Sequence, residues 1–269
     1  MPLTPLQHAL CALLAEARRD RGDSYVAGGV ALNELVGGHR RSHDVDLFHD
    51  TEAALAASWD ADRALLVAHG FDVIVVRERP SFVQARVGQA GQESLVEWVH
   101  DSAYRFFPLV EHAVFGLALH PFDLATNKLL ALVGRREPRD WIDTLQCHQT
   151  LQPLGYLAWA AAGKDPGFSP LAILNEASRS ARYTQVDLDG LDFDGVAPSA
   201  AVTSRLWHAA LDEASALVAH LPAEEAGTCV LDGRGSLLTL APEAIDAAVR
   251  DGKIAFHRGR IRGAWPTIR

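Results

Sequence analysis

Cysteine is scarce in this chain, with only three among 269 residues, at positions 11, 147 and 229. An odd number of widely separated cysteines makes no complete disulfide framework, and no two of them have the spacing of a zinc site. Long apolar runs are also lacking, because Glu16 and the arginines after it interrupt the apolar N-terminal segment, which no basic region precedes. We therefore expect no signal peptide, no membrane span and a cytoplasmic location.

An excess of basic residues is lacking too, since 25 Lys and Arg stand against 34 Asp and Glu for a net charge of −9. Such a balance argues against a broad nucleic-acid-binding surface. The cations are unevenly placed, however, and a local RNA contact through two basic clusters stays open. One cluster is Arg135, Arg136 and Arg139. The other, the basic tail, has one acid, Asp251, and six cations: Arg250, Lys253, Arg258, Arg260, Arg262 and Arg269.

The composition is that of a soluble globular protein, with 48% hydrophobic and 22% charged residues and enough length for a sizeable core. We find no internal repeat and no low-complexity segment. Strand-like and helix-like patterns mix in the first part of the chain, helical patterns follow, and short strand-like runs close it. We therefore expect an α/β (α+β) fold with a core domain over 1–120, a helical domain over 121–220 and a small tail over 221–269.

The expected elements follow from hydrophobic spacing and from Gly and Pro punctuation. In the core we expect helices over 4–19, 30–35 and 51–69, and strands over 25–27, 43–48, 71–77, 82–87 and 95–99. In the helical domain we expect helices over 123–133, 139–149, 156–162, 170–180 and 199–219. In the tail we expect a hairpin of 228–231 with 236–240, a helix over 242–250, and a second hairpin of 253–257 with 260–265.

The most informative stretch begins at Gly28-Gly29 and ends at the Asp44-Val45-Asp46 strand. Alternate residues of a strand share a face, so Asp44 and Asp46 converge while Val45 points into the core. Carboxylate oxygens suit Mg²⁺, which usually keeps waters and substrate phosphates among its ligands. Glycines let the backbone approach a phosphate, and a following helix N-terminus favours negative charge. The stretch therefore predicts a site for Mg²⁺ or Mn²⁺ and a nucleoside triphosphate (NTP).

These residues resemble the nucleotidyltransferase superfamily, whose fingerprint is Gly-Gly, a spacer and Asp-x-Asp. The closer similarity is to its AbiEii/AbiGii toxin branch, which reads Gly-Gly-x-Ala-Leu and then Arg-x-Ser-x-Asp-hydrophobic-Asp-Leu-Phe. The matching positions are Gly28, Gly29, Ala31, Leu32, Arg40, Ser42, Asp44, Asp46, Leu47 and Phe48. The resemblance spans about residues 20 to 150 and implies a mixed sheet with helices.

A second block strengthens the resemblance. The family carries a Lys-Leu-x-Ala-Leu helix and then Arg-Asp-x-x-Asp, as at Lys128 and at Arg139-Asp140-Trp-Ile-Asp143. The resemblance implies that Lys128 binds the triphosphate or the substrate, and that Asp140 orients Lys128 or the attacking hydroxyl. By themselves, a mid-helix lysine is most often solvated, and Asp140 and Asp143 share a helix face where Arg136 or Arg139 could pair with them.

Three further positions bear on the site. Arg40 and Ser42 are either ordinary polar loop residues or part of the site. In the site, Ser42 would hydrogen-bond a phosphate or the aspartate loop, and Arg40 would brace that loop. Glu97, alone on an apolar strand, is the candidate third metal ligand, with Asp101 as its rival; a solvent-facing role is the alternative. Val30 stands where the family often has Thr or Ser, whose hydroxyl helps to bind phosphate. The acidic run 187–195 lacks the register of a calcium loop, and we interpret it as a structural loop.

We therefore interpret the chain as a metal-dependent nucleotidyltransferase that moves an NMP from an NTP to an acceptor. The resemblance implies an RNA acceptor, which is tRNA in some family members, and the role of a toxin that is paired with an antitoxin protein. One alternative is a small acceptor, as in aminoglycoside- or lincosamide-modifying enzymes. The other is a non-catalytic nucleotide-binding or interaction module, which Val30 and the uncertain third acid favour.

Overall fold

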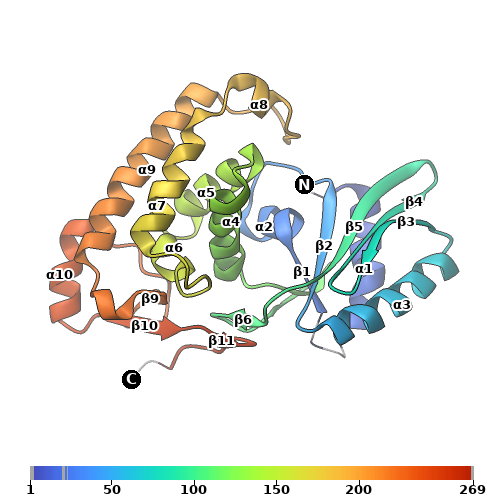
Figure 1. Cartoon of the computed structure of the whole chain (residues 1–269), viewed down its shortest axis with the longest axis horizontal. Coiled ribbons are helices and arrows are strands. Elements are labelled where there is room, and N and C mark those ends of the chain that lie inside the picture. The colour runs from blue at the N-terminus through green and yellow to red at the C-terminus, as the bar shows by residue number, and fades with distance from the viewer. Residues whose placement is uncertain (1–2, 20–21, 23, 268–269) are drawn as a thin grey trace. The chain divides into compact units, whose positions relative to one another are not determined.

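The computed structural model describes residues 3–19, 22 and 24–267, and these fall into two compact units (Figure 1). The first unit comprises Met1–Ala103 and Leu109–His120. The second comprises Tyr104–Pro108 and Pro121–Arg269, so the chain after residue 220 belongs with the helices that precede it. Arg269 of the basic tail lies outside the described residues.

The first unit is built on a seven-stranded mixed sheet with strand order β3-β4-β5-β2-β1-β8-β7. Strand β2 pairs with β5 in parallel and with β1 in antiparallel register. The strands are β1 (Ser24–Ala27), β2 (Asp44–His49), β3 (Asp72–Arg79), β4 (Phe82–Gln89), β5 (Gln92–His100), β7 (Val110–His112) and β8 (Gly116–Ala118). The helices are α1 (Pro5–Arg19), α2 (Gly28–Val36) and α3 (Glu52–Ala68).

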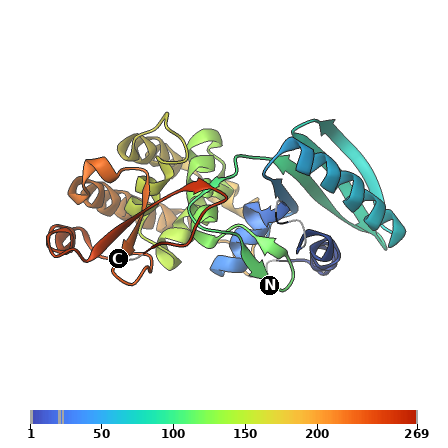
Figure 2. The same cartoon turned by 90° about the horizontal axis from the view of Figure 1, so that it is seen from below.

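Two helices, α1 and α3, contact each other and pack on β5, and α3 runs along the β3–β4–β5 part of the sheet (Figure 2). A fully buried ion pair joins them, with Arg18 Nη2 3.2 Å from Asp62 Oδ2. The same carboxylate oxygen accepts a 2.9 Å hydrogen bond from the indole N–H of Trp98 on β5. Trp98 also packs edge-on against Trp59 of α3. The helix-covered face of the sheet is therefore the core of the unit.

The second unit is mostly helical. Its helix α6 (Leu154–Ala161) is buried at every residue, and α9 (Ala200–His220) approaches it closely. A Cβ at Gly155 would come within 3.0 Å of the Ala214 carbonyl, so glycine permits this approach. The other helices are α4 (Pro121–Arg135), α5 (Pro138–Thr150), α7 (Pro170–Ser178), α8 (Gln185–Asp189), α10 (Pro242–Arg250) and the 3₁₀ turns η1 (Arg179–Arg182) and η2 (Ala223–Glu225).

A short segment between β5 and β7 also belongs to the second unit. Asp123 of α4 is fully buried and accepts hydrogen bonds from the backbone N–H groups of Phe106 and Phe107, at 2.9 and 3.0 Å. Lys164 balances its charge, with Nζ 2.8 Å from Asp123 Oδ1. The carboxylate thus satisfies backbone donors that would otherwise be buried without a partner. The small strand β6 (Tyr104–Arg105) begins this segment.

The mixed α/β fold expected from the sequence is confirmed, and most helices and strands lie within a few residues of their expected bounds. The first tail hairpin forms only in part. Strand β9 (Thr228–Asp232) pairs along its length with β10 (Ile254–Arg258), whereas residues 236–240 give an isolated bridge of Leu237 with Leu231. Two backbone hydrogen bonds support this bridge, from Asp232 N–H to the Ser236 carbonyl at 2.8 Å and from Leu238 N–H to the Val230 carbonyl at 3.1 Å. The carbonyls of Val230 and Leu238 also accept hydrogen bonds from the buried Gln152 side chain.

The second expected hairpin does not form, because its last strand pairs with a different segment of the chain. Strand β11 (Arg260–Ile261) pairs with β6 rather than with β10. Gly259 lets the chain pass Tyr104 closely, because a Cβ there would lie 2.5 Å from the tyrosine ring. The expected acidic loop 187–195 also begins differently: α8 covers Gln185–Asp189, and Thr184 and Asp187 form a capping box.

Candidate functional site

Strand β2 carries the two aspartates that the motif predicted as metal ligands. Its side chains alternate, with Val45, Leu47 and His49 fully buried and Asp44 and Asp46 only half-buried. The aspartates therefore point away from the face that α1 and α3 cover. Both lie on the face of the sheet opposite α1 and α3, which we call the open face.

Glu97 lies on the same open face. The parallel register of β2 and β5 places Glu97 directly beside Asp46, and the register of β4 and β5 places Gln84 beside Glu97. The Gln84 amide donates a 2.6 Å hydrogen bond to Glu97 Oε1, which fixes one carboxylate oxygen. The rival, Asp101, follows β5, and its Oδ1 accepts from the backbone N–H of Ser102. A row of polar side chains thus crosses three strands from Asp46 to Gln84.

The first turn of α2 packs directly against these side chains. Gly28 has a φ of 66°, and a Cβ at this position would overlap the Asp46 carboxylate. A Cβ at Gly29 would lie 2.7 Å from both Arg40 Nη2 and Ser42 Oγ. Any residue larger than glycine at either position would therefore displace a polar side chain of the predicted site. The requirement for Gly28-Gly29 has a local cause in this packing.

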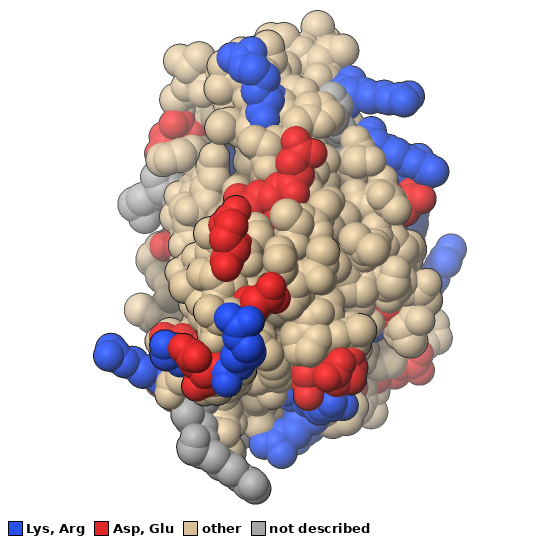
Figure 3. All heavy atoms as spheres, turned by 90° about the vertical axis from the view of Figure 1, so that its left-hand side faces the viewer, with Lys and Arg blue, Asp and Glu red and all other residues tan. Residues whose placement is uncertain are grey.

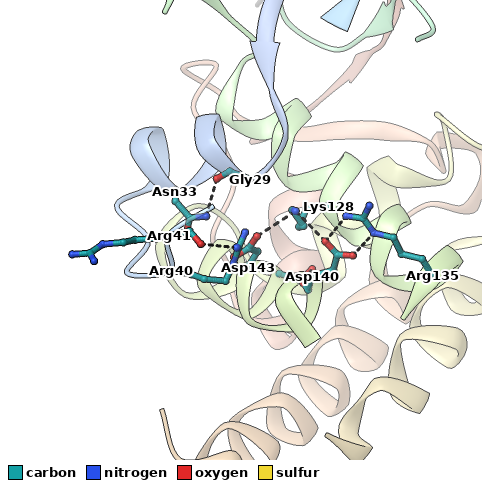
Figure 4. Close-up of polar contacts among 9 residues, drawn as sticks. Gly29, Asn33, Arg40, Arg41, Lys128, Arg135, Asp140 and Asp143 are labelled. Carbon is teal, nitrogen blue, oxygen red and sulfur yellow. Dashed lines mark hydrogen bonds and ion pairs between the residues drawn. The ribbon is translucent and has the colours of Figure 1, made fainter. Parts of the chain in front are cut away.

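Buried hydrogen bonds hold this corner together. Arg40 and Ser42 are both buried, and Arg40 Nη1 donates to the carbonyl of Arg41 at 3.0 Å. Buried Asn33 donates to the Gly29 carbonyl at 2.8 Å, which supports the first turn of α2 (Figure 4). Asn33 was not singled out from the sequence, and only its place four residues after Gly29 on an expected helix could have indicated this contact.

The side chain of Val30 is buried in the core, 1% exposed. A hydroxyl at position 30 of this helix would therefore be enclosed in apolar surroundings. The hydroxyl that does lie beside the glycine pair is that of Ser42. The hydroxyl beside the glycine pair thus comes from a different segment than position 30.

Within the described residues, no group of three or more His, Cys, Asp or Glu side chains is arranged to hold a metal ion. Asp44 and Asp46 nevertheless offer the type and number of protein ligands that Mg²⁺ commonly uses, because this ion is usually held by one or two carboxylates together with substrate phosphates. The donor set therefore fits a metal that arrives with a triphosphate. It does not make a closed three-carboxylate cage with Glu97.

The second block of predicted residues forms a compact ionic cluster in the second unit (Figure 4). Lys128 of α4 is 7% exposed, and its Nζ lies 3.0 Å from Asp140 Oδ1 and 3.2 Å from Asp143 Oδ2 of α5. Arg135 completes the cluster with Nε 2.6 Å from Asp140 Oδ2. The expected contact of Asp140 with Lys128 is therefore present, and Lys128 is enclosed rather than solvated.

The electrostatics of this cluster are dominated by its two cations. Burial by itself raises the pKa of Asp140, but the hydrogen bonds and charges of Arg135 and Lys128 outweigh it and hold the pKa below its usual value. Burial and the charge of Asp143 raise the pKa of the neighbouring Cys147 thiol. Arg135 was expected in an RNA-binding cluster, whereas its guanidinium is used here to neutralise a buried carboxylate.

The structure thus assembles seven of the predicted site residues in the first unit, and Lys128 with Asp140 in the second. The seven are Gly28, Gly29, Arg40, Ser42, Asp44, Asp46 and Glu97. Gln84 is a neighbour of Glu97 that sequence reasoning missed, because alternation along β4 places it on a face without showing what it contacts.

Among the helices of the described part, none is long and apolar enough to cross a membrane.

The arrangement of the sheet and helices is that of a nucleotidyltransferase-like fold. A crystal structure of a candidate nucleotidyltransferase from H. pylori superposes with a TM-score of 0.52 at 16% identity, covering 82% of this chain and 99% of that one. Weaker likenesses are JHP933 from Helicobacter pylori (TM-score 0.43, 16% identity, 79% and 96% covered) and MenT4, a nucleotidyltransferase toxin from Mycobacterium tuberculosis (0.45, 15%, 81% and 86%).

No protein-family model and no curated protein sequence matches the chain. At this level of identity the likeness to the first H. pylori structure establishes the fold, and the reaction has to be argued from the residues of the site.

Proposed function

We propose that the protein is a metal-dependent nucleotidyltransferase that transfers an NMP from an NTP to an acceptor. The observation that carries the proposal is the packing of Gly28 against the Asp46 carboxylate, which sets the N-terminal turn of α2 beside the aspartate pair. A helix N-terminus offers backbone N–H groups to phosphate oxygens, and carboxylates hold the cation that accompanies a triphosphate. The adjacency of the helix N-terminus and the carboxylates supports an NTP site.

Each residue has a distinct role in this proposal. Asp44 and Asp46 hold Mg²⁺ or Mn²⁺, which neutralises charge on the phosphates when it is bound. The backbone of Gly28 and Gly29 faces the triphosphate. Ser42 supplies the hydroxyl that Val30 lacks, and Arg40 braces the Gly29 turn. The 2.7 Å spacing of a Gly29 Cβ position from Arg40 and Ser42 supports both of these roles.

The reaction is an in-line displacement at the α-phosphorus. An oxygen of the acceptor forms a bond to this phosphorus, the bond to the oxygen that bridges the α- and β-phosphates breaks, and pyrophosphate leaves with that oxygen. The proton of the acceptor hydroxyl passes to a base. Glu97 is the candidate base, because it lies beside Asp46 in the β2–β5 register and Gln84 orients its carboxylate.

Turnover can be tested without knowing the acceptor. The full chain is incubated with each γ-labelled NTP, Mg²⁺ or Mn²⁺ and a candidate acceptor pool, and release of labelled pyrophosphate is measured. Metal-dependent release with one or more NTPs is the expected result. Tight NTP binding without release in any pool would instead support the non-catalytic module.

For the acceptor, we propose RNA, with tRNA as the first substrate to test and a toxin role that an antitoxin protein would counteract. This part rests on the resemblance of the two sequence blocks to the AbiEii/AbiGii toxin branch. The exposed tail arginines Arg260 and Arg262 support it, because exposed cations bind phosphates without sequence specificity. Growth arrest on expression, abolished by Asp46→Asn, is the expected cellular result.

A small acceptor is the second candidate, and the charges of the second unit favour it. Arg136 pairs with Glu176 at 2.8 Å and Arg258 with Glu225 at 3.2 Å, as Arg135 does with Asp140. On the side of α9 and α10, acidic side chains follow the middle of the surface and basic ones lie mostly toward its borders (Figure 3). Arg260 pairs through β11 with β6, beside the Phe106 N–H that donates to Asp123 in the first turn of α4, whereas Arg135 ends that helix, about 20 Å further along its axis.

One experiment separates the two acceptors. The chain is given an α-labelled NTP with total RNA in one reaction and with an RNA-free small-molecule extract in the other. Label in RNA, with affinity that falls steeply with salt, supports the RNA acceptor. In the triple variant Arg258→Ala, Arg260→Ala, Arg262→Ala, RNA binding should weaken and its salt dependence flatten while NTP binding is kept. Label only in the extract supports the small acceptor.

A further inference from the structure

The two edges of the seven-stranded sheet differ in a way that bears on self-association. Strand β7 forms one edge and has three residues, whereas β3 forms the other and has eight. Ile74, Val75 and Val76 of β3 are 56%, 37% and 51% exposed. An edge strand presents unpaired backbone N–H and C=O groups, and a long apolar edge is a ready template for another strand.

The bulge in β3 decides which side chains share a face. Val75 pairs with Ala85 of β4 and Arg77 pairs with Gln84, so Val76 is the extra residue. Gln84 lies on the open face, because its amide bonds Glu97 beside Asp46. Arg77 is therefore on the open face as well. Without the extra residue, its side chain would point to the helix-covered face.

The pairing with β4 also assigns faces to the residues of β3 that precede the bulge. Ile74 pairs with Arg86, two residues from Gln84, and Asp72 pairs with Gly88. Ile74 and Asp72 therefore also point to the open face, while Val73 and Val75 point to the side of α3. The open face of the edge thus carries an acid at one end of the apolar stretch and a cation at the other.

We propose that two copies of the chain associate through antiparallel pairing of β3 with β3. In an antiparallel pair, opposite residues share a face, and a twofold axis through Ile74 satisfies this for the whole stretch. Ile74 meets the partner's Ile74, and Val73 meets the partner's Val75. With Val76 as a bulge in the new ladder too, Asp72 meets the partner's Arg77 on the open face.

The pattern selects a second copy over an unrelated strand. A twofold pairing repeats each contact, so the acid and the cation at the two ends are matched twice by the same sequence. The bulge is required for that match, because it alone brings Arg77 to the face of Asp72. A pairing shifted by one residue would set side chains of opposite faces against each other. The association does not depend on the proposed reaction.

Charge reversal tests the register. Sedimentation velocity over a concentration series should give a monomer–dimer equilibrium for the native chain. Asp72→Arg or Arg77→Asp alone places like charges opposite each other twice and should weaken the dimer about tenfold or more. The double variant restores opposite charges and should recover most of the native affinity. Both residues are exposed, so thermal unfolding should change little.

Cross-linking tests the location. The three native cysteines are buried, so a cysteine placed on the surface is the reactive one. With Ile74→Cys, a short bismaleimide should link two copies efficiently. Leu171→Cys, on α7 and 52% exposed, is the matched control and should not link.

The proposal is overturned if the native chain stays monomeric throughout, if the double reversal does not rescue the dimer, or if the Leu171→Cys control links as readily. If the chain is monomeric, the partner of the β3 edge would be a strand of a different protein.

Discussion

The two charged groups that the sequence motifs single out are built in different ways. Asp44 and Asp46 stand half-buried on an open strand face, with the glycine turn of α2 against Asp46. Lys128 is enclosed between Asp140 and Asp143, both almost completely buried, and Arg135 covers Asp140 from outside. Carboxylates on an open face are accessible to a metal-bound solute. A buried network whose charges are neutralised internally contributes first to the folded state.

Substitution of the aspartates should give the largest effect and the sharpest contrast. Asp44→Asn and Asp46→Asn each remove one charge from the proposed metal site, and we expect a loss of about 100-fold or more in NMP transfer. The free energy of unfolding should change by less than about 1 kcal/mol. Asp60→Asn, at an exposed position of α3, is the matched control. Transfer at near-native rate in either variant would contradict the assignment.

Lys128→Met should show the opposite pattern. It leaves Asp140 and Asp143 buried with one cation fewer, and breaking a buried pair of this kind costs about 3 kcal/mol or more. Urea unfolding measures the loss. Arg136→Met is the matched control, because its pair with Glu176 is half-exposed and worth at most about 1 kcal/mol.

Calorimetry on the folded Lys128→Met variant then tests whether Lys128 also binds the triphosphate, as the resemblance implies. A large fall in NTP affinity with little loss of stability would return Lys128 to the ligand role.

Gly28→Ala separates backbone strain from displacement of the carboxylate. Gly28 and Gly37, at the two ends of α2, have φ values of 66° and 70°, but only Gly28 has a neighbour where the Cβ would lie. Gly37→Ala should therefore cost about 1 kcal/mol from strain alone. Gly28→Ala should cost about 2 kcal/mol and also reduce transfer, because Asp46 must move. Equal costs with unchanged transfer would show that Asp46 yields freely.

Most of the first unit was predictable because its signals are local, although the short strands β7 and β8 were not expected. Gly28-Gly29, the alternation of β2 and the cap at Thr51 lie within a few residues of the elements they determine. The tail was not, although its turn does form: Asp232 accepts from the N–H groups of Arg234 and Ser236. The segment after the turn adds only a bridge and two backbone hydrogen bonds to β9, whereas the ladder of β9 is made with β10, beyond an intervening helix.

Within the site, too, local patterns predicted some features, whereas contacts between distant segments were not predictable. The face of Asp44 and Asp46 follows from strand alternation. The Gln84–Glu97 hydrogen bond and the capture of Arg135 by Asp140 depend on register and on how helices pack, which single-sequence patterns do not determine. The capping box at Thr184 and Asp187 was visible in the sequence and could have identified α8.

Arg135→Gln should make the second unit more sensitive to acid. Because the pKa of Asp140 is lowered in the folded state, its ionisation stabilises the protein above the ordinary carboxyl pKa of 3.8, and this stabilisation is lost as pH falls through the folded value. Loss of the Arg135 guanidinium raises the folded pKa toward the ordinary one. We expect acid unfolding, followed by circular dichroism, to begin at higher pH. An unchanged midpoint would show that Lys128 alone sets the pKa of Asp140.

Gln84→Leu should have the smallest effect and tests whether Glu97 takes part in the reaction at all. The substitution removes the 2.6 Å hydrogen bond to Glu97 Oε1 while the fold is kept, since Gln84 lies on the open face of β4. If Glu97 accepts the acceptor proton, losing a hydrogen bond worth about 1 kcal/mol should lower kcat about fivefold with little change in the KM for NTP. Glu97→Gln should lower kcat much further. If Gln84→Leu is silent and Glu97→Gln is equally silent, Glu97 is a surface residue of the sheet, and Asp101 becomes the carboxylate to test next.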